Sequence, residues 1–180
     1  AGYLPSWHLL ELVHTSLGSV RDVPAPSGLD FGPLRPEEYH KVWALCRECF
    51  SDDLWSTPEK WGEGEYREWV GSERFSPELI KVARAGEEIV GLVENQVSAE
   101  ECASLGRKVA HCNMVCVRED WRRKGLATYL ITHSLKLLRD MVMVEVTLDT
   151  EVENVSRAVR VYEGVGFTVR RNYTFYRRPL

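Results

Sequence analysis

The residues best placed to do chemistry lie between Trp121 and Thr128, in the stretch Trp-Arg-Arg-Lys-Gly-Leu-Ala-Thr. An apolar run from Met114 to Val117 precedes this stretch, and apolar residues at helical spacing, beginning with Leu126 and Leu130, follow it. The pattern predicts a strand, a basic turn and then a helix that begins near Gly125. The first amides of a helix have no intrahelical acceptor and the helix dipole adds positive charge there, so this junction is expected to bind an anion.

Charge and main-chain geometry favour the same kind of ligand at this junction. Gly125 permits a close backbone approach that a side chain would block. Arg122, Arg123 and Lys124 place full positive charges beside the helix terminus. Nucleotide-phosphate binding is a poorer interpretation, because the turn lacks both the Gly-Lys-Ser/Thr ending of a P-loop and the Gly-x-Gly-x-x-Gly of a dinucleotide-binding helix.

The cysteines are the other reactive side chains. Cys46 and Cys49 form a Cys-x-x-Cys pair, but the pair lies inside a helical pattern and no second pair accompanies it. An odd total of five cysteines in a chain of this size is typical of reduced thiols and not of a disulfide framework. We therefore expect no metal site.

Composition limits the remaining possibilities. The chain has 180 residues, of which 44% are hydrophobic and 28% charged, as expected for a globular protein with a substantial core. A net charge of -4 argues against a dedicated nucleic-acid binder. No apolar run reaches the roughly 18 to 20 residues that span a bilayer, and no basic segment precedes an apolar signal core. We expect no membrane partner and a cytoplasmic location.

The elements that must position the basic turn follow from changes of period along the chain. The early part reads as a strand over 7–13 and a Pro-rich linker over 20–28, and 99–108 reads as a polar connection. A helical crossover returns the chain to the same sheet, so the strands on either side of the central helix should be parallel. The other predicted strands are 29–34, 80–84, 89–97, 109–117, 142–149, 167–170 and 173–177, and the other helices are 36–50, about 58–70 and one around 158–162.

Two motifs in this order resemble a known family, the GCN5-related N-acetyltransferases (GNAT). The stretch from Val117 to Ala127 is similar to the family's Arg/Gln-x-x-Gly-x-Gly/Ala acetyl-coenzyme A motif. Residues 154–167, which include Tyr162 and end in Gly166-Phe167, are similar to its second motif, Tyr-x-x-x-Gly-Phe. With one helix and one strand between them, the two motifs make a fairly specific resemblance that covers residues 29–180.

This resemblance implies an α/β (α+β) fold: a mixed, mostly antiparallel sheet of six to seven strands with about four helices. Acetyl-CoA would lie where the parallel fourth and fifth strands splay apart, with its pyrophosphate on the helix N-terminus. Asn154 lies one residue farther from Tyr162 than the family's spacing, so Ser156 is an alternative polar contact. The residues assigned to acetyl-CoA are Val115, Cys116, Val117, Arg122, Arg123, Lys124, Gly125, Leu126, Ala127, Thr128, Asn154 and Ser156.

The implied reaction is direct transfer of the acetyl group to a primary amine, expected to belong to a small molecule. By resemblance, Tyr162 is the acid that protonates the departing thiolate. His111 occupies a strand position where some relatives carry a glutamate, and its ordinary pKa near 6.5 suits a base at neutral pH. Glu94, Asn113 and Glu145 remain alternatives for the base. Aromatic residues around 55–69 could form core or line the acceptor pocket.

The resemblance also suggests how the chain is organised. Gly2-Tyr3 and the alternating run that follows look like the end of one acetyltransferase domain, so residues 1–28 are a candidate remnant and linker before an acetyltransferase domain over 29–180. This arrangement resembles the C-terminal half of a tandem, mycothiol synthase-like acetyltransferase. The partner is then either a preceding acetyltransferase domain or a second copy in a homodimer. The alternative function is a catalytically inactive acyl-CoA-binding domain that acts as a sensor or structural partner.

Overall fold

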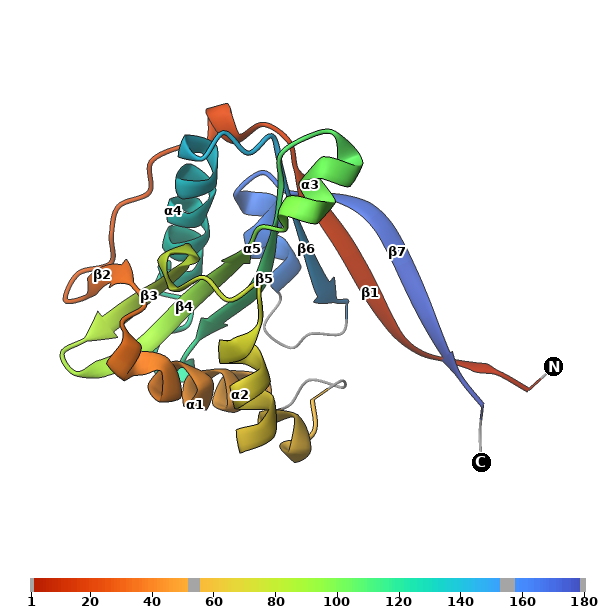
Figure 1. Ribbon diagram of the computed structural model, residues 1–180, viewed down its shortest axis with the longest axis horizontal. Coiled ribbons are helices and arrows are strands. Elements are labelled where there is room, and N and C mark those ends of the chain that lie inside the picture. Colours follow the sequence, from red (N-terminus) through yellow and green to blue (C-terminus); the bar gives the residue numbers. More distant parts are fainter. Residues whose placement is uncertain (1, 52–55, 153–157, 179–180) are drawn as a thin grey trace.

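The computed structural model describes residues 2–51, 56–152 and 158–178, and in this part of the chain seven strands form one mixed sheet (Figure 1). The strand order is β2-β3-β4-β5-β6-β1-β7. The strands are β1 (Leu4–His14), β2 (Asp30–Pro33), β3 (Ile80–Ala85), β4 (Glu88–Gln96), β5 (Val109–Val117), β6 (Glu145–Glu151) and β7 (Thr168–Arg177).

Helices cover both faces of the sheet (Figure 1). The core on one face includes Leu130 of the central helix and Phe167, and the core on the other includes Val42 and Trp61. The mixed α/β fold predicted from the sequence is therefore confirmed. The α-helices are α1 (Tyr39–Cys49), α2 (Glu63–Gly71), α3 (Ala99–Leu105), α4 (Leu126–Asp140) and α5 (Ala158–Gly164).

The strand-helix-strand unit β5-α4-β6 has the predicted parallel pairing, but only at its beginning. Val109 pairs with Glu145, and the pairing ends where His111 faces Thr147. Beyond that pair the two strands separate, which is the splay that the sequence predicted between its fourth and fifth strands. The strands carry higher numbers here because the N-terminal strand belongs to the same sheet.

Gly91 of β4 lets the central helix lie close to the sheet. A Cβ at this position would be 3.2 Å from Leu126 Cδ2, from Leu130 Cδ1 and from the carbonyl oxygen of Cys116. These distances are shorter than ordinary van der Waals contact, so only glycine fits without a shift of the helix. The N-terminal turn of α4 is thereby held directly against β4 and β5.

The polar connection expected over 99–108 is wrong, because this segment contains helix α3. Ser98 caps the helix by accepting a hydrogen bond from the Glu101 amide at 3.2 Å, and Gly106 ends it in the left-handed conformation at φ +62°. Ser98-x-x-Glu101 followed by Gly106 is a capping pattern around a helix of only seven residues. So short a segment gives only a weak helical period, which is why the helix was missed.

Two strand boundaries also differ from those predicted. The two short strands expected over 167–170 and 173–177 are one continuous strand, β7, because β1 pairs with it on both sides of the expected turn at Asn172. The strand expected from residue 142 begins only at Glu145, since Val142 has a φ of +57° that ends the preceding turn.

Strand β1 lies inside the sheet, between β6 and β7. Its residues Leu9 to His14 pair with β6, and Leu4 to Val13 pair with β7 in a ribbon that extends beyond the rest of the molecule (Figure 1). Leu12 is fully buried in the core. The strand is thus a structural part of the domain, and its origin in a preceding acetyltransferase domain stays a prediction.

Candidate functional site

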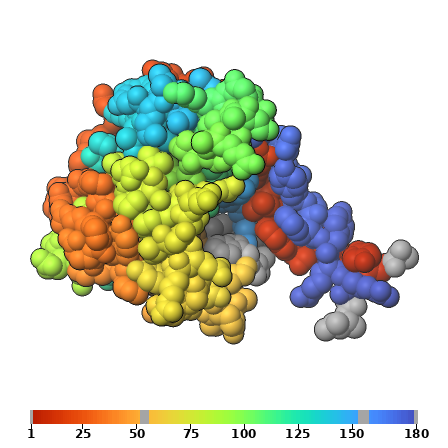
Figure 2. Space-filling model, in the orientation of Figure 1, coloured from red at the N-terminus to blue at the C-terminus, as the bar shows by residue number. Residues whose placement is uncertain are grey.

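A large cleft of about 1770 Å³ opens where β5 and β6 separate. The molecular surface is hollowed there, between the segment around α2 and the ribbon of β1 and β7 (Figure 2). The cleft is lined by the end of β5, the basic turn and first turn of α4, helix α5, and aromatic side chains of α1 and α2. Most of the residues that the sequence assigned to acetyl-CoA therefore meet in one cavity.

The N-terminus of α4 forms one wall of this cleft. Gly125 has a φ of +81°, and the first bond inside the helix runs from the Tyr129 amide to the Gly125 carbonyl at 3.0 Å. The amides of Leu126 to Thr128 come before that bond, so they remain available to an anion. Of the residues assigned to acetyl-CoA at this turn, 122, 123 and 125–128 line the cleft, and Lys124 is not among its lining residues.

Two of the basic side chains at this turn already have contacts within the protein. The Arg122 Nε donates a hydrogen bond of 3.0 Å to the Val117 carbonyl, which ties the turn to the end of β5. The Lys124 ammonium lies 4.9 Å from the centre of the Trp121 ring, a cation-π distance. Arg123 has a φ of +60°, so the main chain is already shaped for a tight turn.

Strand β5 offers an open main-chain edge to the same cleft. Val115, Cys116 and Val117 pair with β4 on one side, whereas pairing with β6 on the other side ended at His111. A register shift between β4 and β5 leaves Asn113 as an extra residue, the sign of a β-bulge. Val115 and Val117 line the cleft, and the Cys116 side chain is buried, so only its main chain can serve a ligand there.

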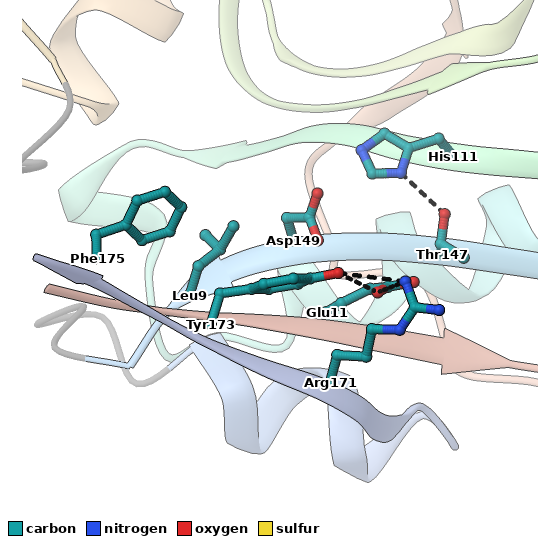
Figure 3. A pocket seen from close by; sticks show the side chains of 8 residues that line it. All are labelled: Leu9, Glu11, His111, Thr147, Asp149, Arg171, Tyr173 and Phe175. Atoms are coloured by element: carbon teal, nitrogen blue, oxygen red, sulfur yellow. Dashed lines mark hydrogen bonds and ion pairs between the residues drawn. The ribbon is translucent and has the colours of Figure 1, made fainter.

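His111 lies at the point where the cleft begins. Its Nδ1 is 2.9 Å from the Thr147 Oγ1, and the other ring nitrogen points away from Thr147 (Figure 3). Burial lowers the pKa of His111, while the carboxylates of Asp149, Glu101 and Glu11 act to raise it. The Arg74 guanidinium, like burial, lowers the pKa. The ring is therefore neutral at pH 7 and able to accept a proton.

A second, smaller cavity of about 400 Å³ adjoins the cleft, and Figure 3 shows the side chains that line it. Leu9, His111 and Asp149 line both cavities, so these three residues lie between them. Burial raises the pKa of the Asp149 carboxyl. The other residues that line the smaller cavity are Glu11, Thr147, Arg171, Tyr173 and Phe175.

Glu11 lines this smaller cavity with a carboxylate that hydrogen bonds hold in place. Its carboxylate accepts a hydrogen bond of 2.7 Å from Arg170 Nε and one of 3.2 Å from the Tyr173 hydroxyl, and Arg171 lies 3.6 Å away. Burial would raise the pKa of Glu11, but these partners outweigh it and the pKa is lowered. Glu11 is thus an ionised group already engaged by protein donors.

The alternative bases named from the sequence do not open to the cleft in the same way. Glu94 is 1% exposed, sealed by hydrogen bonds from Trp69 Nε1 (2.9 Å) and Asn113 Nδ2 (2.7 Å), and burial raises its pKa. Burial would also raise the pKa of Glu145, but ion pairs with Arg170 and Arg107 lower it. Asn113 lines the cleft, but a carboxamide is not a base. His111 is the candidate best placed to take a proton.

Tyr162, the predicted acid, lies on α5 and lines the cleft while being 8% exposed. Its ring also packs edge-on against Phe167, with 6.1 Å between centroids, so it contributes to the core as well. Asn154 and Ser156 lie outside the described residues.

Aromatic residues of α1, α2 and the turn before α2 form a further wall. Trp43, Trp61 and Trp69 line the cleft, and the Trp43 ring lies 4.9 Å from that of Trp61 and 5.5 Å from that of Trp69. The sequence left open whether Trp61 and Trp69 are core residues or line an acceptor pocket, and it did not single out Trp43, which nothing in the helical pattern distinguishes from a core residue. Trp55 lies outside the described residues.

Sequence reasoning also missed Leu9, Glu11 and Asp149. The alternation of β6 did contain a signal for Asp149, because it places Thr147 and Asp149 on one face of the strand. Leu9 and Glu11 could not be found in this way, since their strand was assigned to another domain. Within the described residues, no group of three or more His, Cys, Asp or Glu side chains is arranged to hold a metal, and no helix is long and apolar enough to cross a membrane.

Comparison with known proteins gives a family match and several similar proteins. The family described as "Acetyltransferase (GNAT) family" matches residues 40–167. N-alpha-acetyltransferase 30 of Xenopus laevis is 31% identical over 101 residues, which are 56% of this chain and 36% of the relative. The crystal structure of a GCN5-related N-acetyltransferase from Sphaerobacter thermophilus superposes with a TM-score of 0.78 at 26% identity, over 99% of this chain and 54% of that one.

A further solved structure is the NatC complex bound to Gag peptide and CoA, with a TM-score of 0.61 at 24% identity, over 79% of this chain and 86% of that one. At that identity the likeness concerns the fold alone. This chain spans about a third of the Xenopus relative and about half of the Sphaerobacter chain.

Proposed function

The chain belongs to the GNAT family of acetyltransferases, and we propose that it moves an acetyl group from acetyl-CoA to the primary amine of a small molecule. The observation that carries the proposal is a single cleft in which the α4 N-terminus, the open edge of β5, Tyr162 and His111 all take part. The alternative is a catalytically inactive acyl-CoA-binding domain.

The donor side of the cleft suits acetyl-CoA. The amides from Arg123 to Thr128 would hold the pyrophosphate, with Arg122 and Arg123 adding charge. The main chain of Val115 to Val117 would pair with the pantetheine arm. The left-handed turn at Gly125 supports this placement, because a Cβ there meets no atom within 4 Å and the space beyond the turn is open.

The acceptor must lose a proton before it can attack. An alkylammonium has an ordinary pKa of about 10, so the amine arrives protonated at neutral pH. We assign proton removal to His111, whose second ring nitrogen faces away from Thr147. Asp149 lines both cavities beside His111 and supplies a carboxylate for the incoming ammonium group.

The attacking nitrogen forms a tetrahedral intermediate on the thioester carbon, and the carbon-sulfur bond then breaks. A main-chain donor of β5 aimed at the oxyanion would lower the barrier by about 3 kcal/mol. The Tyr162 hydroxyl donates its proton to the departing thiolate. The amide product carries no charge at its former amine, so Asp149 loses its attraction for it.

The size of the smaller cavity supports a small-molecule acceptor. Its volume of about 400 Å³ falls at the low end of the range for small-ligand sites. A second candidate acceptor is the α-amine of a protein N-terminus, which the similarity to N-alpha-acetyltransferase 30 favours. The reaction needs only cytosolic metabolites, so we place it in the cytoplasm, with a preceding acetyltransferase domain or a second copy as the proposed partner.

The test is thiol release from acetyl-CoA in the presence of single amines. The panel contains small mono- and polyamines, aminosugars, and short peptides that differ only in whether the N-terminus is blocked. Turnover with a small amine above the rate with every peptide supports the proposal, and preference for an open peptide N-terminus supports the second candidate. Tight acetyl-CoA binding without turnover on any amine favours the inactive domain.

A further inference from the structure

Three thiols meet beside the cleft, although only Cys46 and Cys49 share a motif in the sequence. Cys46 and Cys49 lie three residues apart on α1, so both face the same side of the helix. Cys116 of β5 completes the group, with its Sγ 3.6 Å from the Cys46 Sγ. All three are free cysteines.

The three thiols differ in their access to solvent. Cys46 is fully buried and Cys116 is 1% exposed. Cys49 is partly exposed and lines the large cleft, where a small solute can reach it. One thiol of the group therefore faces the cleft, and two buried thiols lie behind it.

The surroundings also make Cys49 the most reactive of the three. Hydrogen bonding from Cys116 and the nearby Arg122 guanidinium lower the pKa of the Cys49 thiol. Burial and the two neighbouring thiols raise the pKa of Cys116 well above its ordinary value. A thiolate is the nucleophile in thiol oxidation, so Cys49 should react first and Cys116 should keep its proton.

We propose that Cys49 is a peroxide-reactive site, and that its oxidation product forms a disulfide with Cys116 that closes the coenzyme side of the cleft. In the first step the Cys49 thiolate attacks hydrogen peroxide, the O-O bond breaks, and a sulfenic acid and hydroxide form. In the second step the Cys116 sulfur attacks the sulfenic sulfur, and the hydroxyl leaves as water with the Cys116 proton. The two thiols lose two electrons together, and the peroxide gains them.

The disulfide would affect the donor side of the cleft through Cys116 and Arg122. Cys116 belongs to the β5 segment that we propose for the pantetheine arm, and Arg122 is bonded to Val117 at the end of that segment. A disulfide holds its two sulfurs about 2.05 Å apart, so it would tie the end of α1 to β5 and fix this edge of the cleft. The effect on coenzyme binding rests on the proposed function, whereas the disulfide itself does not.

Peptide mapping tests the chemistry independently of activity. The reduced protein is treated with hydrogen peroxide, blocked with iodoacetamide and digested. We expect a Cys49–Cys116 cross-linked peptide that dithiothreitol releases, and loss of the free Cys49 thiol at least about tenfold faster than loss of the Cys102 thiol. Cys102 is the matched control, because it is also partly exposed but lies on α3. Equal rates, or Cys49 oxidation without pairing to Cys116, would overturn the proposal.

Titration with coenzyme A tests the consequence. Each variant is compared with its own reduced form, so that any direct effect of the substitution cancels. Oxidation should weaken coenzyme binding by the wild-type and Cys102→Ser proteins about tenfold or more, reversibly, and should leave binding by Cys49→Ser unchanged. Unaltered binding by the cross-linked wild type would refute the link to the cleft. If the reduced protein binds no coenzyme at all, the proposed function is wrong. The peptide mapping still shows whether the disulfide between Cys49 and Cys116 forms.

Discussion

The His111 Nδ1 lies 2.9 Å from the Thr147 hydroxyl oxygen, at the last residue pair that β5 and β6 share before they separate. The contact fixes the imidazole ring at the mouth of the cleft. When Nδ1–H donates to the Thr147 oxygen, the neutral ring carries no proton on Nε2, which is then the nitrogen that can act as a base. His111 and Thr147 are thus the last residues paired between β5 and β6, and the contact between their side chains orients the proposed base.

Replacing Thr147 with valine should lower kcat about three- to tenfold, because the imidazole loses the contact that orients it. Valine has nearly the same shape as threonine, so packing should change little. Thr147→Ser keeps a hydroxyl and should restore most of the rate. Steady-state kinetics on the three proteins provide the check, and equal kcat values for the valine and serine variants would show that the hydroxyl has no such role.

The pH dependence of kcat/KM should have an acidic limb that belongs to His111. A base must be deprotonated to act, so activity falls as the pH drops through the pKa of His111. Burial lowers that pKa, which places the limb below about pH 6.5. The limb should disappear in His111→Ala. A limb at the same pH in both proteins would assign it to another group.

Asp149→Asn should raise KM for the amine and move this acidic limb to lower pH. Asp149 raises the pKa of His111, so its loss lowers that pKa further. Glu101→Gln is the matched control, since Glu101 also raises the pKa of His111 from α3 but lines neither cavity. The control should move the limb and leave KM unchanged. An unaltered KM in Asp149→Asn would exclude Asp149 from acceptor binding.

Tyr162→Phe should lower kcat by about a hundredfold or more while largely sparing the Kd for coenzyme A, because a general acid acts in the transition state and not in binding. The ring and its packing against Phe167 are retained, so folding should be little affected. Turnover and calorimetric binding measure the two quantities separately. Unchanged turnover would leave Tyr162 as a core residue only.

Gly125→Ala and Gly28→Ala form a matched pair for the α4 N-terminus. Both glycines have positive φ values, +81° and +76°, and neither would place a Cβ within 4 Å of another atom. Each substitution should cost roughly 1 to 2 kcal/mol of stability for the left-handed backbone. Only Gly125→Ala should also weaken acetyl-CoA binding. Thermal unfolding and calorimetry compare the two, and equal coenzyme affinities would argue against the cradle at Gly125.

Local patterns in the sequence were enough to predict the basic turn, the helix after it and the parallel strands around it. The strand from Val109 to Val117 contains a run of apolar residues, and the helix that begins at Leu126 has an apolar period of 3.6 that tertiary contacts reinforce. Where the local signal was short, as in α3, or where a distant strand decided the outcome, as in β7, the predictions were wrong. The pairing of β7 with β1 joins residues from opposite ends of the chain, and no local pattern encodes such a partner.

The sequence by itself determined the basic turn and the helix after it, which we propose for the donor side of the cleft, because a helix N-terminus is built from consecutive residues. Only the tertiary structure decided the acceptor side and the thiol group. The cavity at His111 needs Leu9 from β1, Asp149 from β6 and Tyr173 from β7, and the thiol group needs Cys116 beside α1. These residues are neighbours because strands far apart in the chain lie next to one another in the sheet, and that order is set by burial of the whole core and not by any single segment.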